Sequence, residues 1–290
     1  MNMQQTRRVL TGALLTATLV SGAAFATYVY PGKICVQKFY DRNANGIRNT
    51  GEPLLSGWPM TLNPGGITKN TVSGQAIFVV APGTYSITEG TPIQTNWFQS
   101  APRVNGSVVN PLTGIHVYSY QTKTVKFGNY CKKPSGGKTP GFWSNKNGEA
   151  TMNDDGGNGP ELQLLRDLNL VDADGNAFDP TTYGQFNTWL LDSTAVNMAY
   201  KLSSHLAAMR LNVEAGFVSG NAFYFPAGMT INNLMNAANA SLLANPLTID
   251  ASAARTQQEQ LKNALDALNN GANVIPYSPC TKSFYTPPPY

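Results

Sequence analysis

The stretch that decides the fold is KICVQKFYDRNANGIRNTGEPLLSGWPMTL, residues 33–62. The runs at its two ends, KICVQKFY and LLSGWPMTL, have no helical period and favour strands. Between them, Asp41, Asn43 and Asn45 are two residues apart, and Glu52 follows. This spacing is typical of a calcium-binding loop, which usually joins two helices. The sequence therefore predicts a calcium-type loop that joins two strands.

A calcium ion prefers six to eight hard oxygen ligands on a short, flexible loop. Gly46 permits the sharp turn of such a loop. Only Asp41 and Glu52 would bring a full charge, so we expect a Kd of roughly 10⁻⁴–10⁻³ M, which suits extracellular calcium. An Asn-rich hairpin without an ion is the alternative. The expected ligands are Asp41, Asn43, Asn45, Ile47 through its backbone carbonyl, Asn49 directly or through water, and Glu52.

The rest of the chain divides by composition. Residues 33–131 carry short apolar or alternating runs, interrupted by Gly, Pro and Asn at hairpin spacing, which predicts a small antiparallel β-sandwich. Five later segments with a helical period predict a mainly α-helical domain, so the expected fold class is multidomain α+β. The expected parts are a signal peptide at 1–26, the sandwich at 27–131, a polar linker at 132–138, the helical domain at 139–275 and a Pro-rich tail at 276–290.

Residues 1–26 have the parts of a secretory signal peptide. A basic start with Arg7 and Arg8 precedes a short apolar run and a small-x-small site that ends at Ala26. We expect cleavage near Ala26 and a mature chain that is secreted, extracellular or held in the cell envelope. No later segment is long and apolar enough to span a bilayer. No basic run with interleaved aromatic residues points to nucleic acid.

The chain has three cysteines, Cys35, Cys131 and Cys280, and none belongs to a CxxC pair. Export to an oxidising compartment favours one disulfide among them. The odd count leaves one thiol that is free or pairs with another molecule.

Three segments resemble the SdrD B-like (Cna B-type) domains of bacterial surface proteins: KFYDRNANGIRNTGEPLLSGWPMTL, APGTYSITEGTPIQTNWFQSAP and VKFGNYC. The resemblance implies a prealbumin-like β-sandwich, a calcium loop between its first two strands, and a role as a stalk or spacer. It also implies that the first and last strands are adjacent and parallel. With Lys38 level with Asn129, the first two cysteines would be offset by about five residues, beyond disulfide reach. The resemblance therefore favours the pairing Cys131–Cys280.

Some domains of this family join a Lys on the first strand to an Asn on the last, helped by a buried acid. Strand parity places Lys38, Glu89 and Asn129 on the presumed core side of their strands. A buried Lys tends to be neutral and nucleophilic, and a buried Glu tends to be protonated and can donate to the amide carbonyl. With these protonation states, attack of Lys38 on Asn129 would release ammonia and close an amide bond, so a self-crosslink is one of two hypotheses for these residues. A hydrogen-bonded Lys–Glu pair is the alternative.

GGKTPGFWSNKNG, residues 136–148, resembles the TPGYWKNH-type start of a secreted bacterial domain of unknown function, and similar segments continue to residue 275. The resemblance implies no activity. We expect Phe142 and Trp143 to fill a core, with a sugar-stacking platform as the alternative. A second oxygen-rich loop has its Gly at the fourth place, which favours a plain Asx-turn over a cation site. Its members are Asp172, Asp174, Gly175, Asn176 and Asp179.

The sequence contains no recognisable catalytic motif. It has only two histidines, and it lacks a G-x-S-x-G, a P-loop, a dinucleotide fingerprint and zinc-ligand spacing. The sequence therefore predicts a non-enzymatic secreted or cell-surface protein with a calcium-stabilised sandwich and a structural or adhesive role in cell adhesion. Its partner would be a cell-surface protein or polysaccharide. Two alternatives stay open: a glycan- or protein-binding module that uses the helical domain, and a secreted hydrolase with unrecognised carboxylates.

Overall fold

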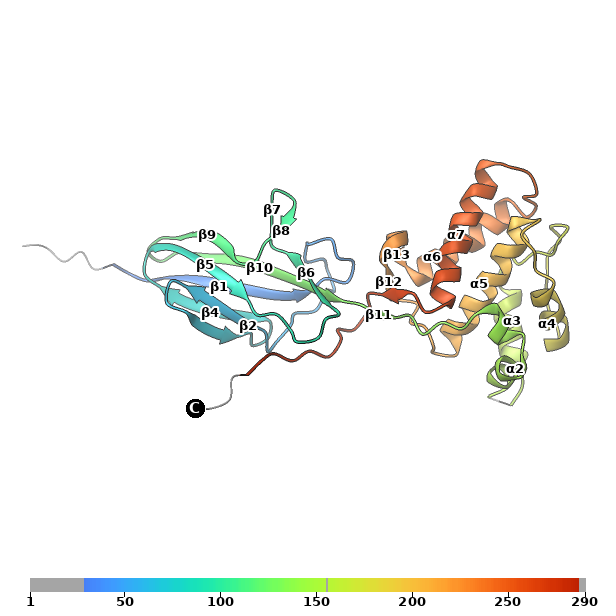
Figure 1. Cartoon of the computed structure of the whole chain (residues 1–290), viewed down its shortest axis with the longest axis horizontal. Helices are drawn as coiled ribbons and strands as arrows, with labels where there is room; N and C mark the ends of the chain where they lie inside the picture. The colour runs from blue at the N-terminus through green and yellow to red at the C-terminus, as the bar shows by residue number, and fades with distance from the viewer. Residues whose placement is uncertain (1–28, 155, 287–290) are drawn as a thin grey trace, which may run out of the picture.

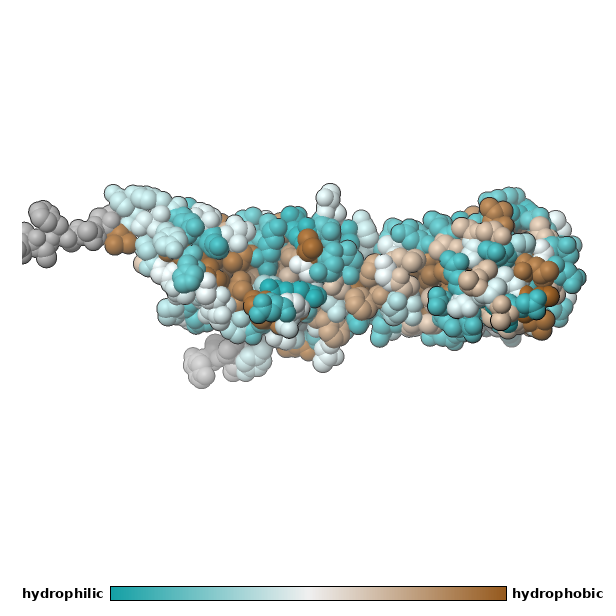
Figure 2. All heavy atoms as spheres, turned by 90° about the horizontal axis from the view of Figure 1, so that it is seen from above, coloured by the Kyte–Doolittle hydropathy of each residue, from teal (hydrophilic) through white to brown (hydrophobic). Residues whose placement is uncertain are grey.

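The protein is elongated, with a β-sandwich and a helical region placed end to end in both views (Figures 1 and 2). This computed structural model describes residues 29–154 and 156–286. The signal peptide predicted for residues 1–26 lies outside the described residues. The described part is a mixed α+β structure, as the sequence predicts. None of its helices is long and apolar enough to cross a bilayer.

Two four-stranded sheets form the sandwich, with the orders β4-β1-β10-β6 and β3-β2-β5-β9. A two-stranded hairpin, β7–β8, stands beside them (Figure 1). The strands are β1 Gly32–Tyr40, β2 Pro59–Asn63, β3 Ile67–Asn70, β4 Gln75–Val80, β5 Gly83–Glu89, β6 Trp97–Ala101, β7 Arg103–Val104, β8 Ser107–Val108, β9 Leu112–Val117 and β10 Thr122–Cys131.

The sheet that contains β1 is mixed, because β1 and β10 are adjacent and parallel, as the resemblance implies; the sandwich is therefore not antiparallel throughout. β1 runs parallel to β10 and antiparallel to β4, because the chain crosses the sandwich several times between its first and last strands. Eight consecutive residue pairs join β1 to β10, from Lys33 opposite Thr122 to Tyr40 opposite Asn129. The first and last strands are thus neighbours along their whole shared length.

The register between β1 and β10 differs from our expectation by two residues. Lys38 pairs with Phe127, and not with Asn129. Cys35 and Cys131 are therefore offset further than expected, and a disulfide between them is even less feasible. Asn129 lies two pairs further along the strands, on the same face as Lys38, and the long Lys38 side chain reaches it.

One apolar cluster holds the two sheets together. Alternating residues face inward on each strand, as a period of two requires. Each large apolar side chain that is fully buried stabilises the fold by roughly 1.5–3 kcal/mol, so this cluster is the main stabilising element of the sandwich. Its members from both sheets include Ile34, Val36, Met60, Leu62, Phe78, Ile87 and Phe127, each at most 2% exposed.

The helical region is built around α5, which packs against α1, α3, α6 and α7. On α5, Ala199, Leu202, Leu206 and Met209 follow steps of three and four along one helix face, and none of them has exposed surface. A short hairpin, β12 Phe223–Tyr224 and β13 Met229–Thr230, flanks the 3₁₀ turn Phe225–Ala227. The helices are α1 Pro140–Trp143, α2 Lys146–Met152, α3 Gly159–Arg166, α4 Tyr183–Leu191, α5 Met198–Glu214, α6 Ile231–Ala244 and α7 Ala253–Asn269.

Local signals in the sequence account for the ends of α7. The Ser252 hydroxyl accepts a hydrogen bond from the backbone N–H of Arg255, which caps the first turn. Gly271 follows the helix with φ 84°, a left-handed conformation that costs glycine little. Trp143 is 1% exposed and packs with Phe142 and Phe217, so this aromatic pair belongs to the core, as expected.

The segment at residues 132–138, expected to be a polar linker, takes part in ordered pairing. β11 Lys133–Pro134 forms a two-stranded ribbon with β14 Asn273–Val274. The backbone N–H of Ser135 also donates to the carbonyl of Ala272 at 3.0 Å. The chain therefore enters and leaves the helical region through one antiparallel ribbon (Figure 1).

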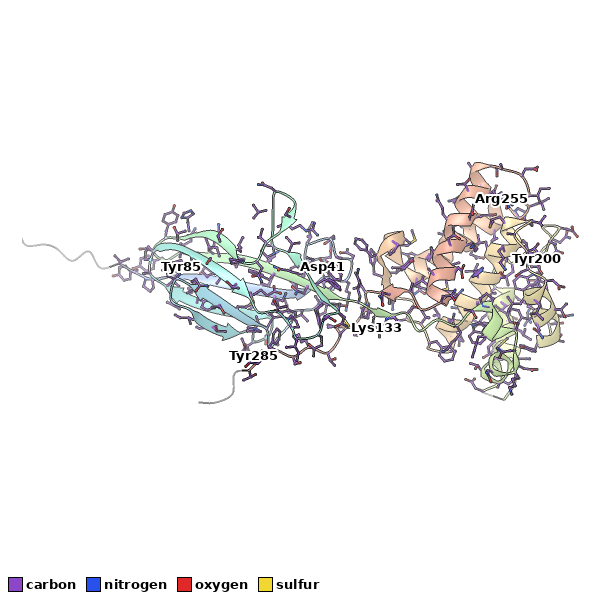
Figure 3. All side chains as sticks on the ribbon, in the orientation of Figure 1. Asp41, Tyr85, Lys133, Tyr200, Arg255 and Tyr285 are labelled. Carbon is purple, nitrogen blue, oxygen red and sulfur yellow. A yellow bond between two sulfur atoms is a disulfide. The ribbon has the colours of Figure 1, made fainter. Side chains whose placement is uncertain are left out.

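After β14, residues 276–286 return along the sandwich, and we call them the C-terminal strap. The Tyr40 hydroxyl donates to the Pro276 carbonyl at 2.8 Å. The Trp97 indole N–H donates to the Thr281 carbonyl at 3.0 Å, and the Ile93 backbone N–H donates to the Ser283 carbonyl at 3.0 Å. Figure 3 places Tyr285 at the lower edge of the sandwich, far from Tyr200 in the helical region. The predicted extended tail is thus bound to the first domain.

His205 on α5 should make folding of the helical region sensitive to acid. Burial lowers its pKa from 6.5 to about 4; Asp266 at 3.8 Å opposes this shift, and the nearby Lys201 and Lys262 add to it. Because the folded pKa lies below the unfolded one, the unfolded chain binds more protons between these values. This contribution to stability is complete above about pH 6.5 and is lost as the pH falls toward 4.

We expect the free energy of unfolding to fall by about 2–3 kcal/mol between pH 7 and pH 4 through His205. Urea denaturation of the wild type and of His205→Gln across this range measures the effect. The variant should show a flatter pH dependence. His116, exposed on β9, provides the control: His116→Gln should keep the wild-type slope. If the free energy of unfolding of His205→Gln depended on pH as steeply as that of the wild type, His205 would not be the source of the acid sensitivity.

Candidate functional site

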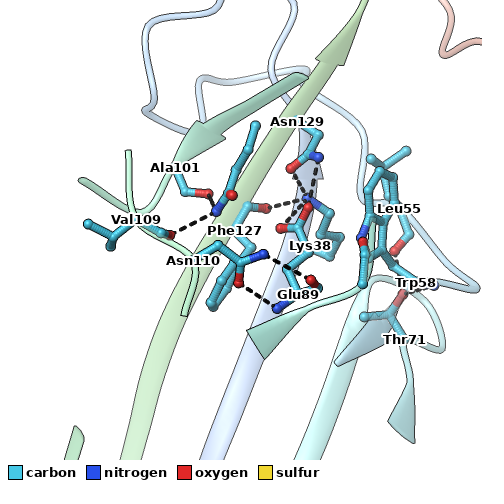
Figure 4. A network of polar contacts seen from close by, with 12 residues as sticks. Lys38, Leu55, Trp58, Thr71, Glu89, Ala101, Val109, Asn110, Phe127 and Asn129 are labelled. Carbon is cyan, nitrogen blue, oxygen red and sulfur yellow. Dashed lines mark hydrogen bonds and ion pairs between the residues drawn. The ribbon is translucent and has the colours of Figure 1, made fainter. Parts of the chain in front are cut away.

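Three polar side chains meet in the core of the sandwich, and they are the three that strand parity selects (Figure 4). Lys38 lies on β1, Glu89 at the end of β5 and Asn129 near the end of β10. Their exposed fractions are 0%, 5% and 3%. A Lys and a Glu are almost never fully buried unless they are paired, so the burial of Lys38 and Glu89 depends on their contact with each other.

Glu89 bridges the other two side chains. Its Oε2 accepts a hydrogen bond from Lys38 Nζ at 3.1 Å, and its Oε1 accepts one from Asn129 Nδ2 at 2.7 Å. Lys38 Nζ also donates to Asn129 Oδ1 and, at 3.4 Å, to the Phe127 carbonyl. Glu89 therefore faces the amide nitrogen of Asn129, whereas we expected it to face the amide carbonyl. The amine lies beside the amide group that it would attack.

Burial shifts both titrating groups toward their neutral forms. Loss of hydration lowers the pKa of Lys38 from 10.5 to about 8, although the Glu89 carboxylate opposes the shift. Loss of hydration also raises the pKa of Glu89, against the opposing effects of Lys38 and of the hydrogen bonds it accepts. A buried pair of this kind gains little from being charged, because desolvation offsets most of the attraction. Burial thus moves the pair in the direction of a neutral amine and a carboxylic acid, the forms that an amide-forming reaction needs.

Two residues that the sequence did not indicate hold this cluster in place. The Trp58 ring lies 4.2 Å from Lys38 Nζ, and its N–H donates to the Gly90 carbonyl at 2.8 Å. The Asn110 amide accepts from the Glu89 backbone N–H at 2.8 Å and donates to the Glu89 carbonyl at 2.9 Å (Figure 4). Trp58 thus excludes water from the amine, and Asn110 fixes the strand end that carries the acid.

The C-terminal strap adds a second layer over the cluster. The Phe284 ring packs edge-on against Trp58, with a centroid distance of 5.2 Å. Lys282 Nζ lies 5.7 Å from the Trp58 centroid, and its positive charge lowers the pKa of Lys38 further. The environment of Lys38 is therefore completed by residues more than 240 positions later in the chain.

The predicted calcium loop leaves β1 at the end nearest the helical region, where Figure 3 labels Asp41. Asp41 is fully buried and accepts from the backbone N–H groups of Asn45 and Gly46, at 3.2 and 2.7 Å. Glu52 is 5% exposed and accepts from the backbone N–H groups of Arg42 and Asn49, at 2.9 and 2.8 Å. The two carboxylates are thus fixed on the two sides of one loop.

The remaining loop residues supply neutral oxygens. Asn49 Oδ1 accepts from the side-chain amides of both Asn43 and Asn45, so these three amides meet inside the loop. The Ile47 side chain is 64% exposed, which leaves its backbone carbonyl as the group it can offer. Gly46 adopts φ 80°, which the sharp turn requires.

The donor set fits a hard cation of modest affinity. Burial raises the pKa of Glu52, and the negative charge of Asp41 raises it further. A divalent ion between these groups would relieve that repulsion. Among the described residues, no three His, Cys, Asp or Glu side chains gather as metal ligands would, so amide and carbonyl oxygens would have to complete the coordination.

The structure joins Cys131 to Cys280, the pairing that the resemblance favours, and leaves Cys35 as a free cysteine. The bridge ties the end of β10 to the C-terminal strap, with a Cα–Cα distance of 6.2 Å. The strap also contacts the calcium-type loop, because the Arg42 guanidinium stacks on the Tyr277 ring at 3.6 Å and donates to the Tyr277 carbonyl at 2.8 Å. The loop, the strap and the polar cluster therefore form one connected region.

The helical region carries an open pocket of about 660 Å³ near α4. The rings of Phe178 and Trp189 stack beside it at 4.4 Å, and the carboxylates of Asp172, Asp174 and Asp192 line it. Asp172 Oδ1 accepts from the backbone N–H groups of Asp174 and Asn176, both at 2.9 Å, which is the Asx-turn that the sequence favours.

Comparison with solved structures finds weak likenesses that cover about a third of this chain. The chain is similar to the TIE protein of Bacillus anthracis (17% identity, TM-score 0.23, 36% of this chain and 17% of that one). It is also similar to the minor pilin GBS52 of Streptococcus agalactiae, with 16% identity and a TM-score of 0.23 over 35% of this chain and 44% of that one. A third similar structure is the shaft pilin spaA of Lactobacillus rhamnosus GG as its D295N mutant, with 12% identity and a TM-score of 0.23 over 34% of this chain and 50% of that one. These likenesses are too weak to carry an argument. No protein-family model and no curated protein matches the chain.

Proposed function

We propose that the protein is a non-enzymatic, exported structural or adhesive protein whose prealbumin-like sandwich locks itself with an amide bond between Lys38 and Asn129. The observation that carries this proposal is the buried cluster of Lys38, Glu89 and Asn129, which bridges the first and last strands. A catalytic site needs access for a substrate, whereas these three side chains are at most 5% exposed. Their chemistry can therefore act only on the protein itself.

The crosslinking step balances without any added reactant. The neutral Lys38 amine forms a bond from Nζ to Cγ of Asn129, and the bond from Cγ to Nδ2 breaks. The Glu89 carboxylic acid gives its proton to Nδ2 through Oε1 as its Oε2 takes one from Nζ, and its two hydrogen bonds already reach both nitrogens. Ammonia leaves, and no electrons are exchanged with another molecule. The product is one amide across 91 positions of the chain.

We further propose that the loop from Asp41 to Glu52 binds Ca²⁺ and fixes the end of the sandwich that meets the strap. With calcium about 10-fold above Kd, which a millimolar titration reaches, binding should stabilise the folded state by about 1.4 kcal/mol. A millimolar titration followed by calorimetry and thermal melting measures this effect. Asp41→Asn should abolish the calcium heat, whereas Asp172→Asn in the helical Asx-turn should keep it. Wild-type protein with no calcium heat and an unchanged Tm in chelator would refute the site.

The proposed export is tested by where the mature chain is found and where it begins. We expect the protein in the envelope or the medium of the producing cell, with an amino terminus near Thr27. Fractionation followed by amino-terminal sequencing measures both. Accumulation in the cytoplasm with residues 1–26 attached would contradict an extracellular role. A pull-down from the producing cell's surface, with and without calcium, would identify the partner.

A binding role for the helical region is the second proposal, and the aromatic and acidic pocket favours it. Residues 139–275 contain thirteen Asp or Glu against six Lys or Arg, whereas the remaining chain is basic. Opposite charge speeds association and selects partners, so this region suits a basic protein surface better than a neutral glycan. Capture of surface proteins that weakens with salt would support this role, and binding on a glycan array would favour a polysaccharide instead.

A further inference from the structure

The disulfide and the proposed amide meet at the end of β10. The disulfide holds Cys131, and the proposed amide would hold Asn129, two positions earlier on the same strand. One link leads back to β1, and the other leads forward to the C-terminal strap. The whole helical region lies within the 149-position loop that the disulfide closes.

The β11–β14 ribbon, through which the chain enters and leaves the helical region, has a geometry that resists tension poorly. β11 and β14 are antiparallel, and Lys133 pairs with Val274 at the ends nearest the sandwich. A load that entered at Lys132 and left at Ile275 would pull this ribbon open from one end, one pair at a time. By contrast, a load that enters β1 from Gly32 and leaves β10 at Cys131 would shear all eight pairs between these strands together.

We propose that the Cys131–Cys280 bridge is a tension shunt, which carries load directly from the sandwich to the C-terminal strap and leaves the helical region unloaded. Tension applied between β1 and the strap passes from β10 through the disulfide and never reaches β11 or α1 through α7. The helical region then stays folded, because it is attached to the loaded part of the chain but carries none of the load. Its pocket near α4 keeps its shape while the molecule is pulled.

The shunt itself stands on the disulfide and the strap contacts, and it does not require the amide. The strap is held at Thr281 and Ser283 by hydrogen bonds to the sandwich, and Phe284 packs on Trp58. If the proposed amide also forms, the covalent path from Tyr30 to Tyr285 contains only eighteen residues: 30–38, 129–131 and 280–285. In that case the load bypasses residues 39–128 of the sandwich and residues 132–279, which include the helical region.

Single-molecule pulling tests the shunt, with handle proteins fused before Thr27 and after Tyr290 of the mature chain. The loop behind the disulfide would add roughly 500 Å of extension, at about 3.3–3.6 Å per residue over 149 positions. The loop behind the amide would add roughly 300 Å over 91 positions. These two lengths are different enough to be assigned separately in each trace.

Oxidised wild-type molecules should never show the 500 Å gain, and the same molecules should show it after addition of a reductant. Cys35→Ser should behave as the wild type, and Cys280→Ser should show the gain without reductant. A 500 Å gain in oxidised protein, or its absence after reduction, would overturn the shunt. A 300 Å gain in oxidised wild-type protein would instead overturn the proposed amide and leave the shunt intact.

Discussion

Replacing Lys38 by Met is expected to lower the free energy of unfolding of the sandwich by roughly 4–5 kcal/mol, because it removes the proposed amide between β1 and β10. A covalent link across 91 positions restricts the unfolded chain, and the chain-entropy argument for disulfides gives this magnitude for a loop of that length. Met nearly preserves the side-chain volume, so the cavity cost stays small. Guanidinium denaturation of both proteins under non-reducing conditions measures the difference.

The matched control is Lys69→Met, which changes an exposed Lys on β3. We expect the control to differ from the wild type by less than about 0.5 kcal/mol, as surface substitutions usually do. Glu89→Gln keeps the shape of the acid but cannot carry the proton, so it should resemble Lys38→Met. Equal stability of the wild type and Lys38→Met would show that no link restricts the chain there.

Loss of the Cys131–Cys280 bridge is expected to lower the free energy of unfolding by roughly 4–5 kcal/mol, independently of the amide. This is about the chain-entropy value for a loop of more than 100 residues. Cys280→Ser tests this, because Cys280 lies on the strap and its replacement leaves the buried Cys131 in the core. Urea unfolding should show a lower midpoint for the variant, and reductant should bring the wild type to the same midpoint. Cys35→Ser should leave the midpoint unchanged. A wild-type midpoint that is insensitive to reductant would contradict this account.

Local patterns in the sequence were sufficient for most elements of the fold. Alternation at Ile34, Val36 and Lys38 predicted both β1 and the inward direction of its polar residue, since parity alone decides which face a side chain takes. Apolar residues at steps of three and four from Ala199 to Met209 form the buried face of α5, so a helical period is a sufficient signal for this element. Ser252 precedes the first residue of α7 and Gly271 lies two residues beyond its last, so local signals mark both ends of this helix.

Contacts between distant segments could not be predicted in the same way. The register of β1 on β10 depends on the loops at both ends, and a shift of two residues preserves the parity that the pattern reveals. Neither Trp58 over Lys38 nor Asn110 on the Glu89 backbone follows from any period, because each contact joins different strands. The docking of the strap was missed for the same reason: Phe284 meets Trp58 across more than 220 positions. β6 and the β7–β8 hairpin are too short and irregular to give a clear alternation.

The central claim is that Lys38 and Asn129 are covalently joined, and the mass of the purified mature chain tests it most directly. After correction for the two hydrogens lost to the disulfide, the wild type should be lighter than its sequence by one ammonia, and Lys38→Met should have its full calculated mass. Fragmentation after digestion should recover one branched peptide that contains both residues. A wild-type chain at full mass, with separate unmodified peptides for Lys38 and Asn129, would contradict the account.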